Sequence, residues 1–196
     1  MTGLAERFRH ATAGLYAMMA FKPGWRARFD VSFDGMIASF GGALIALPAF
    51  ALIVLGSNHF IAAHPDIVDP TAQVGLWGAA GQYARIWLLF PPVALLVCLV
   101  LGLKTGLAAW ITVHNWAVAV LLWIQALIWM LHAAGIIGLE MLSFLLALYQ
   151  VLRLVVHWRV AMGALGLHWG IAAGAACIPL IVDAILVYGL TAGAGG

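Results

Sequence analysis

Charged residues are scarce in this chain. Asp, Glu, Lys and Arg make up 8% of its 196 residues and hydrophobic residues 65%, whereas a soluble domain carries about 25% charged residues. Water is therefore not expected to be the main solvent of the folded chain. The formal net charge of +2 gives no electrostatic support for binding nucleic acid. The mean hydropathy of +1.08 instead indicates an integral membrane protein.

Cysteine and the common catalytic motifs are also rare or absent. Cys98 and Cys177 both lie in apolar runs, and their spacing gives neither a disulfide framework nor a CxxC metal site. The sequence contains no GxSxG, no HExxH and no phosphate-binding loop. We therefore expect no enzymatic activity.

What the chain does have is long uncharged stretches, and the one in the middle of the sequence organises the rest. Residues 107–131 contain no Asp, Glu, Lys or Arg. At the helical rise they would extend about 37 Å, enough to cross a hydrocarbon core of about 30 Å. One face of this helix would carry His114, Val118, Leu121, Gln125, Ile128 and His132. The pattern predicts a central transmembrane helix packed against its neighbours.

The remaining apolar runs predict an all-α bundle of five spans in residues 35–190. The spans are expected at residues 36–55, 84–103, 107–131, 136–156 and 167–190. A short tail, residues 191–196, follows the bundle.

A cytoplasmic lead-in, residues 1–34, precedes the bundle. Apolar residues recur at helical spacing from Leu4 to Met19, which predicts an amphipathic helix lying in the membrane interface. The basic residues that follow this helix are candidates for contact with lipid headgroups: Lys22, Arg26 and Arg28.

The positions of the cations predict the orientation of the chain. With five spans, all but one of the Lys and Arg residues fall on one side, and only Arg85 falls toward the other. The positive-inside rule then gives a cytoplasmic N-terminus and an external C-terminus, in a bacterial inner membrane.

Three charged residues in or near the outer half of the membrane form a candidate group: Arg85, Glu140 and Asp183. Unpaired charges are costly there, so such residues pair, reach the headgroups or serve a pathway. We predict an ion pair of Arg85 with Asp183 or with Glu140. The alternative is that each residue reaches the headgroups by itself.

Other polar and small residues predict contacts between helices. Polar contacts are expected from Asn115, Gln125, Gln150 and Arg153. Of these, Asn115, Gln150 and Arg153 are expected to hydrogen-bond across the third and fourth spans. Close packing of helix backbones is expected along a stripe of Gly166, Gly170 and Gly174.

Histidines raise the alternative of haem binding. His114 and His132 lie on one face of the central helix, and each would need a histidine from another span as a second ligand. The two histidines would lie about 27 Å apart along the helix, near opposite membrane surfaces. This separation argues against haem binding. The partners within reach of His114 would be His157 or His168. Those within reach of His132 would be His59 or His64. A zinc site on the outer loop would use His59, His64, Asp66 and Asp69, whose spacing is not diagnostic. We predict no bound cofactor or metal.

One feature of the later spans suggests a family. The expected chain has an amphipathic lead-in, five spans and a Gly-rich last span. Its fourth span contains Tyr149-Gln150-Val151-Leu152-Arg153 and is followed by His157-Trp158-Arg159. This arrangement resembles the bacterial relatives of the Yip family over most of the chain, through topology more than through a signature. The resemblance implies a membrane organiser, whose eukaryotic counterparts bind trafficking GTPases. No functional residue transfers.

Three classes of function follow from these features. The leading hypothesis is a non-enzymatic organiser, assembly factor or accessory subunit, with membrane lipids and other membrane subunits or a second copy as partners. The second is a small transporter or proton pathway using Arg85, Glu140, Asp183 and Gln125. The third is a membrane haem or quinone protein.

Overall fold

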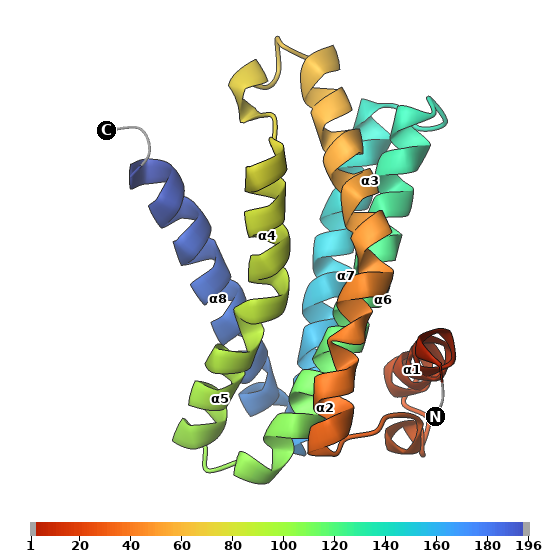
Figure 1. The fold of residues 1–196 in the computed structure, drawn as a ribbon, viewed down its shortest axis with the longest axis vertical. Coiled ribbons are helices and arrows are strands. Elements are labelled where there is room, and N and C mark those ends of the chain that lie inside the picture. Colours follow the sequence, from red (N-terminus) through yellow and green to blue (C-terminus); the bar gives the residue numbers. More distant parts are fainter. Residues whose placement is uncertain (1–2, 194–196) are drawn as a thin grey trace.

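The fold is described by a computed structural model of residues 3–193, which includes all side chains except those of residue 104 and residues 187–193. Every regular element in this range is a helix, and five of the helical segments are long and apolar enough to cross a membrane. The all-α bundle predicted from the sequence is therefore confirmed. The described chain begins and ends at opposite ends of the bundle (Figure 1).

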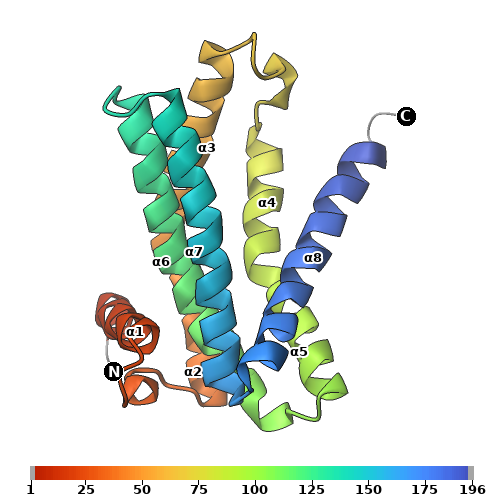
Figure 2. The same ribbon diagram turned by 180° about the vertical axis from the view of Figure 1, so that it is seen from behind.

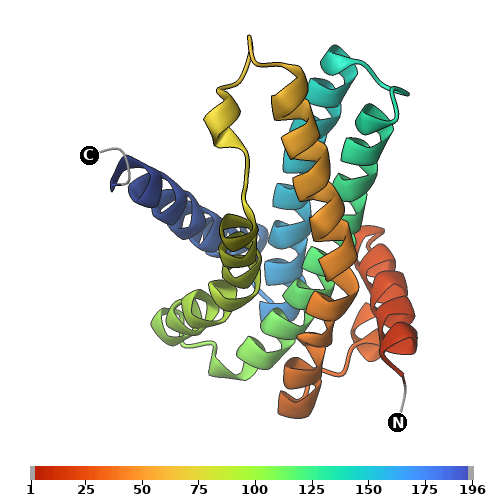
Figure 3. The same ribbon diagram turned by 45° about the horizontal axis from the view of Figure 1, so that its top comes forward.

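The lead-in forms helix α1 (Leu4–Met19) and a 3-10 turn, η1 (Trp25–Arg28). Helix α1 runs across one end of the bundle, as Figures 1 and 3 show from two directions. Its apolar face packs on the protein, with Ala11, Leu15 and Met18 in the core. Arg159 of the bundle donates a hydrogen bond to the carbonyl oxygen of Met18 at 2.6 Å. The amphipathic helix predicted from the sequence therefore buries its apolar face against other helices.

The first membrane segment consists of α2 (Phe33–Ser39) and α3 (Gly41–Ala63). The Ser32 hydroxyl caps the start of α2 by accepting a hydrogen bond from the amide of Gly35. Helix α3 lies along α6 (Leu107–Ala133), and glycines permit the close approach. A Cβ atom at Gly56 would lie 2.9 Å from the Cβ of Trp129, so no larger residue fits there unless α3 moves.

The second segment is broken into α4 (Leu76–Leu88) and α5 (Phe90–Val100). Pro91 and Pro92 follow the break and cannot donate backbone hydrogen bonds to the preceding turn. Helix α4 begins earlier than residue 84, where the sequence predicted the span to start. The loop between α3 and α4 is shorter than expected because α3 extends to Ala63, beyond residue 55, and this loop includes the 3-10 turn η2 (Pro70–Ala72).

Helix α6 is the centre of the bundle, as the sequence predicted. It follows the 3-10 turn η3 (Lys104–Gly106) and packs against α1, α2, α3, α5 and α7. More than half of its residues are buried, including the run from Ala109 to Ala119. The predicted face of α6 points into the protein, with His114, Val118, Leu121 and Ile128 buried.

The last two segments are α7 (Leu139–Leu165) and α8 (Trp169–Gly193). The turn between them includes Gly166, whose φ of 67° lies in the left-handed region that favours glycine. Helix α7 continues past residue 156, where the sequence predicted its end. From the turn, α8 leans progressively away from α7, as both Figure 1 and Figure 2 show.

Candidate functional site

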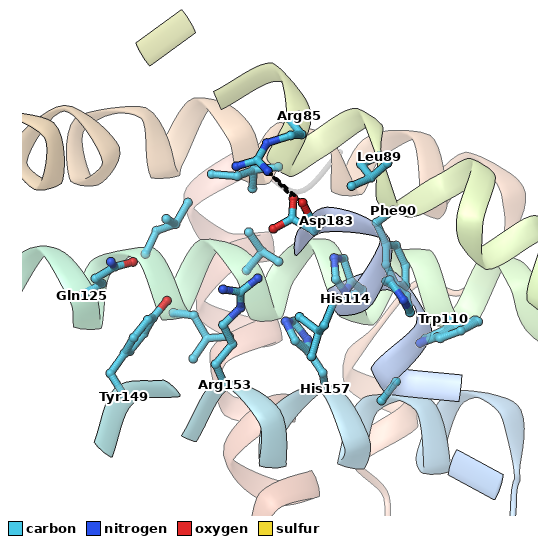
Figure 4. A pocket seen from close by; sticks show the side chains of 17 residues that line it. Arg85, Leu89, Phe90, Trp110, His114, Gln125, Tyr149, Arg153, His157 and Asp183 are labelled. Carbon is cyan, nitrogen blue, oxygen red and sulfur yellow. Dashed lines mark hydrogen bonds and ion pairs between the residues drawn. The ribbon is translucent and has the colours of Figure 1, made fainter. Parts of the chain in front are cut away.

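A cavity of about 190 Å³ lies among the helices of the second half of the bundle. Its walls come from α4, α5, α6, α7 and α8, and they are apolar over much of their area. Its polar and charged side chains are Arg85, His114, Gln125, Tyr149, Arg153, His157 and Asp183 (Figure 4). Most of these residues were singled out in the sequence for separate reasons, and the fold brings them together.

The cavity lies near the middle of the bundle's length. Along the helix axes, Arg153 lies about 18 Å from the end of α7 and Asp183 about 21 Å from the start of α8. These two helix ends lie at the same end of the bundle (Figure 2). Since a hydrocarbon core is about 30 Å thick, both charges would be near its centre in a membrane-spanning orientation.

Arg85 and Asp183 form an ion pair in the cavity, with Nη1 and Oδ1 2.8 Å apart. The pair joins α4 to α8, which otherwise make few contacts with each other. Both side chains remain partly exposed, at 25% and 30%. Glu140 is not part of this group, because it lies exposed in the first turn of α7. The structure thus brings together two of the three charged residues that the sequence grouped.

A stripe of side chains along α7 forms the wall of the cavity opposite the ion pair. Tyr149, Arg153 and His157 follow one another at four-residue intervals, so their side chains emerge on one face of the helix. Arg153 points from this face into the cavity (Figure 4). Arg153 has no acidic partner, since the only ion pairs in the described residues are Glu6–His10 and Arg85–Asp183.

Two imidazole rings lie stacked at one end of the cavity. The His114 ring lies between Phe90, at a centroid distance of 3.3 Å, and His157, at 4.9 Å. His157 is 7% exposed, and its Nδ1 atom has no hydrogen-bond partner among the described residues. Because the two rings meet face to face, their nitrogens do not flank a shared axial site. This arrangement does not suit ligation of one haem iron by both histidines.

Other predicted polar contacts differ from the expectation. Asn115 donates a hydrogen bond to the hydroxyl of Ser39 at 2.9 Å, so it links α6 to α2 and not the third span to the fourth. Gln150 is exposed on α7, and Arg153 faces the cavity. The sequence pattern identified these residues as polar groups within spans, but it did not specify the face of α7 that packs on α6.

The predicted glycine stripe does not pack within the chain. Gly166 belongs to the turn before α8, and Cβ atoms built at Gly170 and Gly174 would meet nothing within 4 Å. The face of α8 that packs on the bundle instead carries Ala172, Ala175 and Ala176. Within the described chain the stripe therefore does not make the predicted close contacts, because the face of α8 that packs on the bundle is the one that carries the alanines.

The remaining histidines lie away from the cavity. His132 lies near His64, with ring centroids 6.3 Å apart, and its Nδ1 atom lies 3.1 Å from the carbonyl oxygen of Ile137. His59 and His168 are exposed. In the described part of the chain, no three His, Cys, Asp or Glu side chains are close enough to hold a metal ion. The zinc candidates of the outer loop are therefore not gathered into a site.

Asp69 in the outer loop has a structural role. Its carboxylate accepts hydrogen bonds from the amide and the hydroxyl of Thr71, each at 2.8 Å. Both bonds lower the pKa of Asp69 below its ordinary value, and the bond from the amide has the larger effect.

The predicted headgroup contacts lie at the end of the bundle that carries α1. Lys22, Arg26 and Arg28 are exposed there, and Arg26 also donates a hydrogen bond to the carbonyl oxygen of Ala164 at 2.9 Å. A second cavity nearby is lined by Arg7, Arg28 and Asp30, among others. Hydrogen bonds from Ser32 lower the pKa of Asp30.

Sequence reasoning placed His157 within reach of His114 but missed that Tyr149 and Arg153 lie on the same face of α7 beside this pair. The signal was the four-residue spacing of residues 149, 153 and 157, which puts a phenol, a guanidinium and an imidazole on one helix face.

No protein-family model, curated protein or solved structure matches this chain. The resemblance to the Yip family stays a prediction.

Proposed function

We propose that this chain is a non-enzymatic membrane protein that binds a small solute in the cavity and provides a pathway for that solute, or for protons, through the bilayer. The observation that carries the proposal is the set of Arg85, Arg153 and Asp183 around one cavity at mid-length of the bundle. Ionisable residues at this depth are costly, and in membrane proteins they mark ion and substrate pathways.

One break between helices and one proline within a helix support a transport role. The second membrane segment is interrupted at Leu89, next to the cavity, and Pro179 interrupts the hydrogen-bond pattern of α8 where that helix lines the cavity. Transporters build their midplane sites from interrupted helices of this kind. The break at Leu89 and the hydrogen bond that Pro179 cannot donate would let α4 and α8 move relative to α6 and α7.

Substituted cysteines test this proposal through water access. In a variant with Cys98 and Cys177 replaced by alanine, a single cysteine is introduced as Leu180→Cys or as Ile181→Cys. Leu180 lines the cavity, whereas Ile181 is the next residue on α8 and is 56% exposed on its outer face. The two positions have almost the same depth, so a difference in labelling reports access and not depth.

We expect a membrane-impermeant thiol reagent to modify Leu180→Cys in membranes and to leave Ile181→Cys unmodified. Labelling of Leu180→Cys from both sides of the membrane would indicate a pathway, and labelling from one side a site that opens to that side. If neither cysteine reacts from either side, the cavity is closed to water and the proposal is wrong.

A second candidate function, an organiser or accessory subunit, is favoured by the uncovered glycines of α8. Gly170 and Gly174 present a smooth surface that nothing in the described chain covers, and such surfaces pack transmembrane helices together. Purification from native membranes in mild detergent tests this role. A partner or second copy that is lost in Gly174→Leu supports it, and a lone monomer contradicts it.

A further inference from the structure

We propose that the ligand of the cavity is a small organic monocarboxylate with a compact apolar body, and that the guanidinium of Arg153 binds its carboxylate. This inference rests on the proposed function, since it names the chemical class of the solute. It follows from the charge of the cavity, from the polar side chains on either side of Arg153 and from the size of the cavity.

The charge of the cavity calls for an anion. Arg85 and Asp183 neutralise each other, which leaves Arg153 as one uncompensated positive charge when the histidines are neutral. A cation left without a partner at this depth is costly. A single carboxylate would compensate the charge, and it would match the planar geometry of the guanidinium with two parallel hydrogen bonds.

Arg153 is better placed for this role than Arg85. The guanidinium of Arg85 already contacts two groups of Asp183: the carboxylate at 2.8 Å and the backbone carbonyl oxygen at 3.4 Å. Arg153 stands across the cavity on α7 without an acidic partner among the described residues. An anion that bound Arg85 would have to share its guanidinium with Asp183, whereas one that bound Arg153 would not.

The neighbours of Arg153 supply further polar contacts. His157 lies one turn along the same face, is nine-tenths buried and lines the cavity. A neutral imidazole carries one N–H group, which can donate to an anion. Tyr149 lies one turn on the other side of Arg153, and its phenol can also donate to an anion.

The size and the walls of the cavity define the rest of the ligand. Its volume of about 190 Å³ somewhat exceeds the roughly 150 Å³ of an apolar cavity that binds benzene. The walls between the polar groups are formed by Leu89, Leu121, Leu122 and Leu180, together with aromatic side chains. An apolar body of benzene size that carries one carboxylate therefore fits both the volume and the lining.

The experiment compares benzoate with benzamide, which has nearly the same shape but no charge. Binding is measured by isothermal titration calorimetry on the full-length protein in lipid nanodiscs. We expect benzoate to bind at least about tenfold more tightly than benzamide, because hydrogen bonds to a charged group are worth about 1.5–3 kcal/mol.

Three variants locate the binding. Arg153→Gln should remove the preference for benzoate, and Arg153→Lys should keep part of it, because the charge remains while the planar fork is lost. Arg28→Gln, at the exposed end near α1, is the matched control and should bind both compounds as the unmodified protein does. A loss of benzoate binding in Arg28→Gln but not in Arg153→Gln would place the anion in the second cavity and overturn the proposal.

Other outcomes also decide the matter. Equal affinity for benzoate and benzamide, or no binding of benzoate to the unmodified protein, overturns the assignment of an anion even if Arg153→Gln fails to fold. If Leu180→Cys is labelled while benzoate does not bind, the pathway stands and only the ligand class is wrong. If benzoate binds while Leu180→Cys is not labelled in the absence of ligand, the anion site stands without the pathway.

Discussion

The ion pair between Arg85 and Asp183 is the contact at residue scale that links α8 to α4. Asp183→Asn would leave the guanidinium of Arg85 without a carboxylate in an apolar surrounding. We expect a loss of about 1–3 kcal/mol in the free energy of unfolding, less than the 3–5 kcal/mol of a fully buried pair, because both side chains are partly exposed. Thermal unfolding in detergent would measure the change.

A double-mutant cycle separates the pair from its surroundings. Arg85→Gln combined with Asp183→Asn should cost less than the sum of the single changes, since the double variant contains no unpaired charge. Glu140→Gln is the control, because Glu140 is exposed and forms no ion pair within the described chain. Additive losses would show that the two charges do not stabilise each other.

The pKa of Asp69 gives a second prediction at this scale. The lowered pKa means that the hydrogen bonds from Thr71 favour the folded loop above the ordinary Asp pKa of 3.8, and that this contribution disappears as the pH falls through the lowered value. Thr71→Val removes the hydroxyl but keeps the amide. We expect the pKa of Asp69 to rise toward its ordinary value in an NMR titration, and an unchanged pKa would contradict the assigned cause.

At the scale of single residues, the sequence identified polar groups but not their partners. It singled out Arg85 and Asp183 because charges are rare in membrane spans, and it proposed their pairing as one of two options. It could not specify that Asn115 bonds to Ser39, because the rotation of each helix depends on packing across the whole bundle.

Helix α3 packs tightly against Trp129 of helix α6 at Gly56, and this contact gives a prediction at the scale of elements. Gly56→Val would place a side chain within 2.9 Å of the Cβ of Trp129 and force the two helices apart. Overpacking of this kind costs about 1–3 kcal/mol, which a lower unfolding temperature would report.

Gly174→Val is the matched control for this change. It makes the same substitution within a transmembrane helix, but a Cβ atom at Gly174 meets nothing within 4 Å. We expect its monomer to unfold at the same temperature as the unmodified protein. Equal destabilisation by both substitutions would show that loss of glycine, and not the contact with Trp129, is responsible.

The elements themselves were largely predictable. Hydrophobic runs set the number of spans, and α1 covers the residues that the amphipathic pattern indicated. The ends of α4 and α7 differ from the prediction, because Arg85 and the sequence around His157 read as interfacial when each span is considered alone. Both residues lie inside helices because the cavity provides them with polar surroundings.

At the scale of the whole molecule, the cavity exists because α8 leans away from α7 and the second segment breaks between α4 and α5. Neither the tilt nor the break has a signal in hydropathy, which responds only to composition along the chain. The sequence therefore predicted a bundle of five spans but not the cavity within it.

The central claim of this account is that five helices cross the bilayer, which puts the cavity near its midplane and the two ends of the chain on opposite sides. Two reporters, each fused after Gly196, test the claim most directly. Alkaline phosphatase is active only outside the cytoplasm, and green fluorescent protein fluoresces only when it stays in the cytoplasm. With the N-terminus in the cytoplasm, we predict an active phosphatase fusion and a dark fluorescent one. A fluorescent fusion with an inactive phosphatase would place both ends on the same side and contradict the five crossings.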